Sequence, residues 1–452
     1  MVKVARSDLL RGFCFAVALL VGLPTDIRID FGGGLPDITV QRAIMIALTI
    51  MWMRSAQRAN RIGSRYLSNL LILLLITRTF STLLSIAPVR SIKEFIGFAI
   101  ENLLFFRIAS SLVIDRASQI ATCKAVVTGL SITAFLGVIE RWAHLSVPGL
   151  LLPRFRYIGE AVQSTYPDQH LFGYAMAMGV PLVTVLLDES APGRRKLYWW
   201  AGLFSMMVSC YFSNARGPWM GLAIGLCIGF LIGGTATRKR YMLIGAAGAI
   251  MILVRPGVQD TIINLSKSTF ETDDIKAYSY TYRWRLWPVA WSEISKSPDR
   301  FLFGYGGLST ETMDLSRYFV AGQGGDTFLL GYTSWDNQYA GDLIEYGLAG
   351  FLIEILLYAL IAACLLKRWY TASGSVKLLH AATIASVAIF LFAQSNLWIF
   401  SIQLKLVFWA IVALGFVSSE SPFEKDLSIE ETSSGNAINR IVQAHDRSES
   451  LQ

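Results

Sequence analysis

Apolar segments of about 20 residues recur along most of the chain, separated by short polar stretches. This is the length that an α-helix needs to cross the hydrocarbon core of a bilayer. The segments begin near residues 9, 38, 66, 91, 118, 169, 197, 217, 241, 341, 377 and 397. The pattern therefore predicts an all-α, polytopic membrane protein of about twelve transmembrane helices.

One long polar segment interrupts this pattern, between the ninth and the tenth apolar segment. It spans residues 256–340 and is rich in aromatic side chains. A loop of this length is usually functional or disordered, and disordered segments are poor in aromatics. We therefore predict a folded periplasmic cap that carries the chemistry. Transmembrane regions at 1–255 and 341–418 flank the cap, and a polar tail at 419–452 is expected to be disordered in the cytoplasm.

Lys and Arg gather in alternate loops, as the positive-inside rule requires of a bacterial inner-membrane protein. Basic clusters lie at 54–65, 115–124, 194–196, 238–240 and 367–368. Alternation predicts that both termini are cytoplasmic. It also predicts that residues 141–168, the turn at 213–218 and the cap share the periplasmic face. The clusters account for the formal charge of +8, so we expect the lipid bilayer and not nucleic acid as a partner.

Composition excludes several further classes. The chain is 54% hydrophobic and only 16% charged, which is too apolar for a soluble domain. Its five cysteines form no CxxC pair, and its four histidines have no nucleophile at a suitable spacing, so a disulfide framework, a zinc site and a hydrolase triad are not supported. An Asp-x-Asp motif is also absent from the sequence. We expect no cofactor, and a diphosphate neutralised by arginine instead of by a metal ion.

Four charged residues fall inside apolar segments: Arg78, Glu101, Arg107 and Lys405. Charges in a membrane helix are costly and usually face a cavity or a partner. Arg78 and Lys405 would both lie toward the outer half. One interpretation is a basic cleft for an anionic lipid headgroup, and the other is a set of intramembrane salt bridges with Glu94 and Glu101, which lie one heptad apart.

Five arginines are placed on the predicted periplasmic face. Arg216 lies in a turn between two apolar segments, Arg283 and Arg285 lie in the cap, and Arg154 and Arg156 lie in the other outer loop. The planar guanidinium group donates two parallel hydrogen bonds to a phosphate, so together these residues suggest a diphosphate site. The alternative for each one singly is a contact with lipid headgroups or a surface ion pair.

A short polar motif directly precedes the tenth apolar segment. Asp336 could act as a general base toward a sugar hydroxyl, or could cap the helix that begins near Gln338. Both roles can hold at once. Asn337 and Tyr339 are weaker candidates for hydrogen bonds to substrate.

Several of these motifs together resemble the superfamily of O-antigen ligases and Wzy-type polymerases. They are SNARGPW at 213–219, Arg283 followed by Trp287 and Ala290, PDRFLFGYGG at 298–307, DNQY at 336–339 and EYGLAG at 345–350. The resemblance covers roughly residues 205–360. The run at 157–181 is similar to the segment before the sixth span in these proteins.

The resemblance implies an inverting, metal-independent glycosyltransferase with a GT-C-like membrane fold. Such an enzyme moves a glycan from an undecaprenyl-diphosphate carrier to an acceptor at the periplasmic face. Arg216 and Arg283 match the family's diphosphate-binding arginines, with Arg285 as the alternative to Arg283. Asp336 stands where ligases carry a histidine, which favours a polymerase of O-antigen or exopolysaccharide, acting with a chain-length regulator. The alternatives are a ligase that joins glycan to lipid A core and a polysaccharide flippase.

Overall fold

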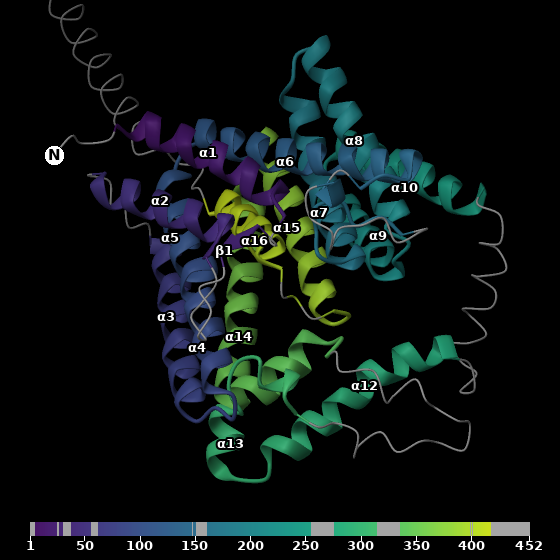
Figure 1. Cartoon of the computed structure of the whole chain (residues 1–452). Helices are drawn as coiled ribbons and strands as arrows, with labels where there is room; N and C mark the ends of the chain where they lie inside the picture. The colour runs from purple at the N-terminus through teal and green to yellow at the C-terminus, as the bar shows by residue number, and fades with distance from the viewer. Residues whose placement is uncertain are drawn as a thin grey trace, which may run out of the picture.

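The computed structural model describes residues 5–24, 27–29, 38–55, 62–146, 148–150, 161–254, 275–313, 335–397, 399 and 401–416. Figure 1 shows a bundle of helices, with α12 and α13 at one end of it. The short strands β1 (Arg28–Ile29) and β2 (Ile38–Thr39) pair antiparallel near the end of α1. The prediction of an all-helical fold is thus confirmed apart from this pair of two-residue strands.

The helices follow one another with short connections. They are α1 (Arg6–Gly22), α2 (Val40–Arg54), α3 (Ile62–Leu83), α4 (Pro88–Phe98), the π-helix η1 (Ala99–Leu104), α5 (Phe105–Leu112), α6 (Arg116–Ala143), the 3₁₀ turn η2 (Pro148–Leu150), α7 (Gln169–Glu189), α8 (Arg194–Phe212), α9 (Arg216–Ile232), α10 (Thr235–Val254), α12 (Ile275–Ile294), α13 (Pro298–Phe303), the 3₁₀ turn η4 (Ser309–Glu311), α14 (Gln338–Thr371), α15 (Gly374–Gln394) and α16 (Ile402–Gly415).

Every predicted apolar segment coincides with a helix or with a run of consecutive helices. Within the described residues, six stretches are long and apolar enough to cross a membrane: α3 from Arg65, α4 through α5, α6, α7, α14 and α15. The helices α9 and α16 are apolar but shorter. The chain is therefore a multi-pass helical membrane protein. The full count of twelve crossings and the GT-C-like likeness stay predictions.

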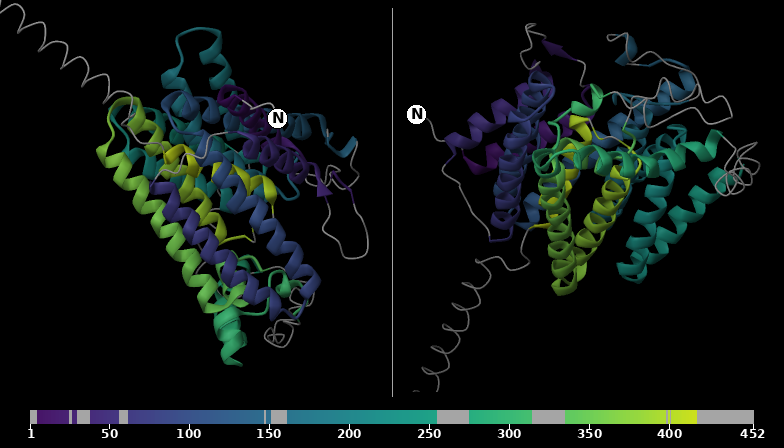
Figure 2. Two further views of the ribbon diagram at one scale, coloured as in Figure 1. Left: turned by 90° about the vertical axis from the view of Figure 1, so that its left-hand side faces the viewer. Right: turned by 90° about the horizontal axis from the view of Figure 1, so that it is seen from below.

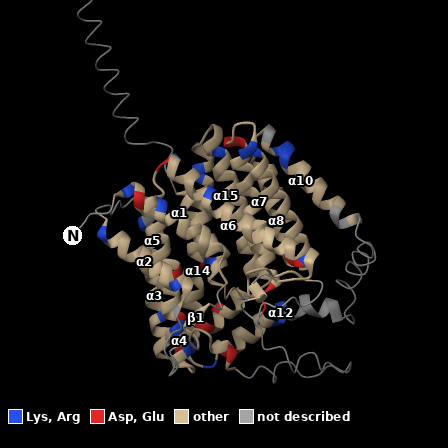
Figure 3. Ribbon diagram, turned by 45° about the horizontal axis from the view of Figure 1, so that its top comes forward, with Lys and Arg blue, Asp and Glu red and all other residues tan. Residues whose placement is uncertain are grey.

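Contacts between loops show that the helix ends alternate as the sequence predicts. At one end, Arg6 ahead of α1 donates to the carboxylate of Asp115, at 2.9 Å. At the same end, Arg116 bonds to Glu189 after α7 and to the carbonyl of Ser375 in α15. All of these loops were assigned to the cytoplasmic side. Figure 3 shows Lys and Arg side chains at this end of the bundle, where α10 begins.

The loops that were assigned to the periplasm meet at the opposite end. The amide group of Gln403 donates to the carbonyls of Leu23, after α1, and of Thr165, before α7. The cap joins this end as well, because the amide of Ile86, after α3, donates to the carbonyl of Tyr305 at 3.1 Å. The structure thus separates the two sets of loops, while their assignment to cytoplasm and periplasm stays a prediction.

The cap is described over residues 275–313 and 335–340, where it is largely helical. Leu286, Ala290 and Ile294 recur on one face of α12 and pack against Trp335 and Ile344. Burying this apolar face fixes α12 across the beginning of α14. The remainder of the predicted cap and the predicted tail at 419–452 lie outside the described residues.

Two glycines bring the cap into backbone contact with α14. Gly304 (φ 71°) ends α13, and Gly347 (φ 65°) interrupts α14, so both occupy the left-handed region that favours glycine. A Cβ on Gly304 would lie 2.5 Å from the carbonyl oxygen of Glu345, and one on Gly347 would lie 2.5 Å from that of Leu302. The break at Gly347 also frees the Glu345 carbonyl, which accepts from Gly306 at 2.9 Å.

The helix α14 connects the cap to the rest of the bundle. It runs beside α3 along its length, as both views of Figure 2 show. The hydroxyl of Ser81 in α3 donates to the carbonyl of Glu345, at 2.6 Å. One carbonyl on α14 therefore holds both α3 and the cap, and the residues that precede it are positioned by both.

Candidate functional site

Two of the residues predicted from the sequence, Arg283 and Asp336, lie against each other. Arg283 is on α12, and its Nε donates to the carbonyl oxygens of Asp336, at 3.2 Å, and of Asn396, at 3.0 Å. Its Nη2 lies 3.7 Å from Oδ2 of Asp336. The two side chains are 21% and 14% exposed. They are thus partly desolvated but reachable, which suits a site that admits a substrate.

Asn337, not Asp336, caps α14. Its Oδ1 accepts from the amide of Ala340 at 3.2 Å, which is the bond of an N-cap residue to the third helical position. Its Nδ2 donates to the carbonyl of Arg283 at 3.4 Å. The alternative in which Asp336 caps the helix is therefore wrong. The carboxylate of Asp336 faces Arg283, and Asn337 orders the backbone on both sides of the pair.

A tyrosine that the sequence analysis did not select, Tyr174 of α7, extends this site. Its side chain is 1% exposed, and its hydroxyl has no hydrogen-bond partner in the described part of the chain. The charge of Arg283 acts on this hydroxyl. A Cβ on Gly217 would lie 2.5 Å from the same oxygen. Tyr174 thus links Arg283 to the start of α9, and a lone phenol in the apolar segment at 169–187 was the signal that could have indicated it.

Arg216 is the first residue of α9, and its side chain is exposed. No hydrogen bond or ion pair joins it to the described residues. It adjoins Gly217, and therefore the Tyr174 hydroxyl. The N-terminus of a helix favours anions because its first amide groups are unpaired and the helix dipole is positive there. This position suits the predicted contact with a diphosphate.

The other predicted residues lie in different surroundings. Arg285 is exposed on α12, unlike the half-buried Arg283. The hydroxyl of Tyr339 donates to the carbonyl of Leu391 at 3.0 Å, so it joins α14 to α15. Arg154 and Arg156 lie outside the described residues.

The beginning of α7, which carries Tyr174, is fixed by Asp168. This residue caps the helix, and its carboxylate accepts from the amides of His170 and Leu171. Burial alone would raise the pKa of Asp168, but the hydrogen bonds and charge of His170 lower it below the ordinary value. The His170 Nδ1 atom lies 3.0 Å from Oδ1. His170 therefore supports the helix and has no nucleophile partner among the described residues.

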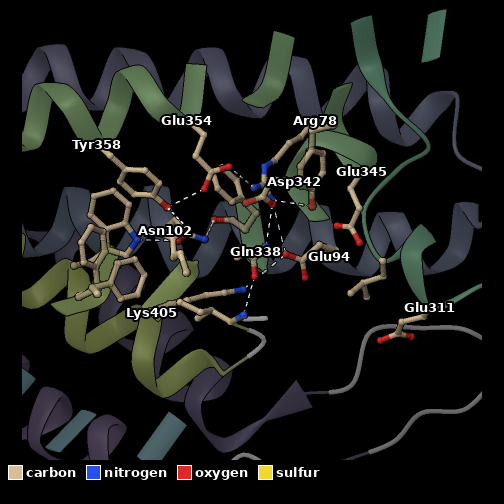
Figure 4. Close-up of a pocket in the computed structure, with 18 residues that line it drawn as sticks. Arg78, Glu94, Asn102, Glu311, Gln338, Asp342, Glu345, Glu354, Tyr358 and Lys405 are labelled. Carbon is tan, nitrogen blue, oxygen red and sulfur yellow. Dashed lines mark hydrogen bonds and ion pairs between the residues drawn. The ribbon is translucent and has the colours of Figure 1, made fainter. Parts of the chain in front are cut away.

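A second feature is a cavity of about 410 Å³ between α3, α4, η1, α14, α15 and α16, referred to below as the polar cavity (Figure 4). Arg78 lies on its wall, 5% exposed, between the rings of Phe98 and Tyr346 at 4.0 and 3.8 Å. Its guanidinium nitrogens lie 3.8 Å from Glu94 and 3.5 Å from Glu354. Arg78 is thus held by two rings and two carboxylates.

Lys405 of α16 completes the network. Its Nζ lies 3.7 Å from Glu94 and 3.6 Å from Glu101, and Arg42 contacts Glu101 at 3.2 Å. Of the two interpretations of the intramembrane charges, the structure shows the salt bridges. Arg78 and Lys405 therefore do not form a basic cleft, because each cation is matched by carboxylates.

Both walls of the polar cavity contain an irregular helix. The π-helix η1 carries Asn102, whose side-chain oxygen accepts from the indole of Trp409 at 2.7 Å. The break at Gly347 lies on the opposite wall, beside Tyr346. Such irregularities are frequent at functional sites.

Several polar residues of α14 that line the cavity were not selected from the sequence. Gln338, Asp342, Glu345, Glu354 and Tyr358 lie on its wall, and the first three recur at helical spacing. A polar stripe inside an apolar segment could have indicated them. In the part of the chain that the structure describes, there is no cluster of three or more His, Cys, Asp or Glu side chains arranged to hold a metal ion.

Comparison with known proteins supports the resemblance drawn from the motifs. Residues 201–355 match the family model described as O-antigen ligase. This region contains Arg216, Arg283, Asp336 and the beginning of α14, and it agrees closely with the predicted limits of 205–360. No curated protein matches the chain. The region thus belongs to the O-antigen ligase and Wzy superfamily, which implies glycosyl transfer as its general chemistry.

Proposed function

We propose that the protein is an inverting, metal-independent glycosyltransferase that polymerises undecaprenyl-diphosphate-linked glycan repeat units at the periplasmic face of the bacterial inner membrane. It contributes in this way to the synthesis of a cell-surface polysaccharide, either O-antigen or exopolysaccharide. The supporting observation is the contact between Arg283 and Asp336 in a region of the O-antigen ligase family. In this proposal residues 256–340 are a periplasmic cap, and both termini are cytoplasmic.

The donor diphosphate lies between Arg283 and Arg216. Arg283 is partly buried and can direct its planar group at a phosphate, while Arg216 adds a charge at the N-terminus of α9. The unpaired hydroxyl of Tyr174 lies between them and donates to a phosphate or sugar oxygen. Neutralising the diphosphate stabilises the leaving group, which requires no metal ion in this arrangement.

Asp336 supplies the base. Its carboxylate removes the proton from an acceptor hydroxyl, and the hydroxyl oxygen attacks the anomeric carbon of the donor sugar. The bond from that carbon to the diphosphate oxygen breaks, and undecaprenyl diphosphate leaves with the electron pair. A single displacement of this kind inverts the anomeric centre. Asp336 can serve here without loss of helix capping, because Asn337 caps α14.

A carboxylate at position 336, where ligases carry histidine, favours a polymerase. A ligase reaction onto lipid A core would use the same donor site with a different acceptor. The neighbouring genes would separate the two, since a flippase and a chain-length regulator accompany a polymerase, whereas lipopolysaccharide-core genes accompany a ligase.

A deletion strain tests the proposed function. We expect lipid-linked repeat units to accumulate at the periplasmic leaflet and long polysaccharide chains to disappear. Accumulation at the cytoplasmic leaflet would instead indicate a flippase. Normal long chains in the deletion strain would exclude a polymerase.

A further inference from the structure

Two buried side-chain atoms on the wall of the polar cavity lack hydrogen-bond partners in the described part of the chain. They are Oδ2 of Asp342, an acceptor, and Nε2 of Gln394, a donor. The side chains are 2% and 1% exposed. Buried polar groups are nearly always paired, so a group missing from the protein itself is expected to pair with them. A hydroxyl both donates and accepts, which suits this combination.

Aromatic rings form much of the remaining wall. The Phe390 and Phe408 rings stack with centroids 4.0 Å apart, and Trp409 lies against Phe408 at 4.9 Å. A cavity of about 410 Å³ is in the size range of small-molecule sites. Apolar faces together with a few directed polar groups are typical of such sites and match the alternating faces and edges of a sugar ring.

The charge of the polar cavity selects against anionic sugars. The cations Arg78 and Lys405 are paired with Glu94, Glu101 and Glu354. Asp342 accepts only from Gln338 among the described residues, at 2.9 Å, and Glu345 accepts from the hydroxyl of Thr310 at 2.6 Å. Neither of these two carboxylates has a cation within 4 Å in the described part of the chain, so a ligand carboxylate would meet uncompensated negative charge.

The polar cavity adjoins the site of Arg283 and Asp336. Gln338 lines the cavity and follows Asp336 by two residues, and Gln394 lines the cavity and precedes Asn396, which accepts from Arg283, by two residues. Two residues of extended chain span at most about 7 Å. The beginning of α14 and the end of α15 therefore each carry one residue to the polar cavity and one to the reaction site.

We propose that the polar cavity binds a non-anionic sugar residue of the acceptor glycan. The assignment rests on the proposed function and adds the acceptor to it. The donor diphosphate then approaches Asp336 from the side of α7 and α9, and the acceptor approaches from the side of α3, α14 and α16. A sugar ring between the aromatic walls has its hydroxyls on Asp342 and Gln394 and extends the next hydroxyl toward Asp336.

Calorimetric titration of the purified full-length protein in nanodiscs tests this assignment. The probe is the oligosaccharide released by mild acid from the lipid-linked glycan of the deletion strain. We expect saturable binding to the wild type and at least about fivefold weaker binding to Gln394→Leu and to Asp342→Asn, since each loses one hydrogen-bonding partner of the sugar. Thermal unfolding of each variant verifies that it is folded.

Gln119→Leu is the matched control. Gln119 is also fully buried, but it donates to the carbonyl of Leu414 at the opposite end of the bundle. We expect it to bind the oligosaccharide within twofold of the wild type, and Arg283→Lys to do the same, because the probe lacks the diphosphate. No binding to the wild type, equal binding by Gln394→Leu, or a loss confined to Arg283→Lys would overturn the assignment.

Two further results separate the parts of the proposal. Oxidising the primary hydroxyls of the probe to carboxylates should weaken binding at least about tenfold, and an unchanged affinity would contradict the exclusion of anionic sugars. A deletion strain that accumulates no lipid-linked glycan would instead refute the proposed function itself, and the acceptor assignment with it.

Discussion

The guanidinium group of Arg283 faces the carboxylate of Asp336, with Nη2 3.7 Å from Oδ2, although the two residues are 53 positions apart in the chain. The distance is longer than a hydrogen bond, so the guanidinium group can turn to an incoming phosphate without breaking a strong contact. The same proximity keeps the carboxylate deprotonated and ready to accept a proton. One residue pair thus serves both the leaving group and the nucleophile.

We predict that Arg283→Lys lowers the rate of glycan transfer by about tenfold or more. A lysine keeps the charge but cannot donate two parallel hydrogen bonds, and truncation to glutamine should cost about 2 to 5 kcal/mol of transition-state binding. Arg285→Lys is the matched control, because Arg285 is exposed on the same helix. The measurement is the initial rate with lipid-linked donor. A larger loss in Arg285→Lys than in Arg283→Lys would assign the diphosphate contact to the wrong arginine.

We predict that Gly347→Ala destabilises the junction between the cap and α14. Its left-handed backbone strains any other residue, and the new Cβ would meet the backbone of Leu302 at 2.5 Å. We expect a clear drop in the thermal unfolding midpoint and faster proteolysis within the cap. Gly245→Ala is the control, since that helical glycine has open space around its Cβ position and alanine favours helix. An equal response of the two variants would count against close backbone packing.

Membrane orientation can be tested with single cysteines in a cysteine-free background. Thr312→Cys lies on an exposed position of the cap, and Ser373→Cys lies on an exposed position between α14 and α15. We expect a membrane-impermeant thiol reagent to label Thr312→Cys in intact spheroplasts and to label Ser373→Cys only after permeabilisation. The reverse pattern would invert the topology.

The sequence predicted the helical architecture well because spans in a bilayer must be both apolar and helical. Its hydropathy located the segments that become α1 to α10 and α14 to α16, and the charge of the loops predicted the alternation of their ends. The glycines at 304 and 347 were noticed as motif residues, but their reason was not visible. It depends on two backbones that approach each other between distant segments, which no local pattern reports.

The candidate site could be predicted only in part. Arg283 and Asp336 are recognisable in motifs, whereas Tyr174 and Gln394 lie in apolar segments and become notable only because their polar atoms lack partners. The N-cap was misplaced by one residue, since the sequence offers both Asp336 and Asn337 at the start of α14. Only the hydrogen bond from the Ala340 amide to Asn337 distinguishes them.

The most direct test of the account is the rate of chain formation by purified Asp336→Asn, compared with Asn337→Ala. Asp336→Asn removes the base but leaves the cap of α14, so we predict a normal unfolding midpoint and a loss of long chains, with lipid-linked repeat units left unreacted. Asn337→Ala should lose about 1 kcal/mol of stability and retain measurable transfer. Near wild-type chain formation by a folded Asp336→Asn would contradict the assignment of Asp336 as the base.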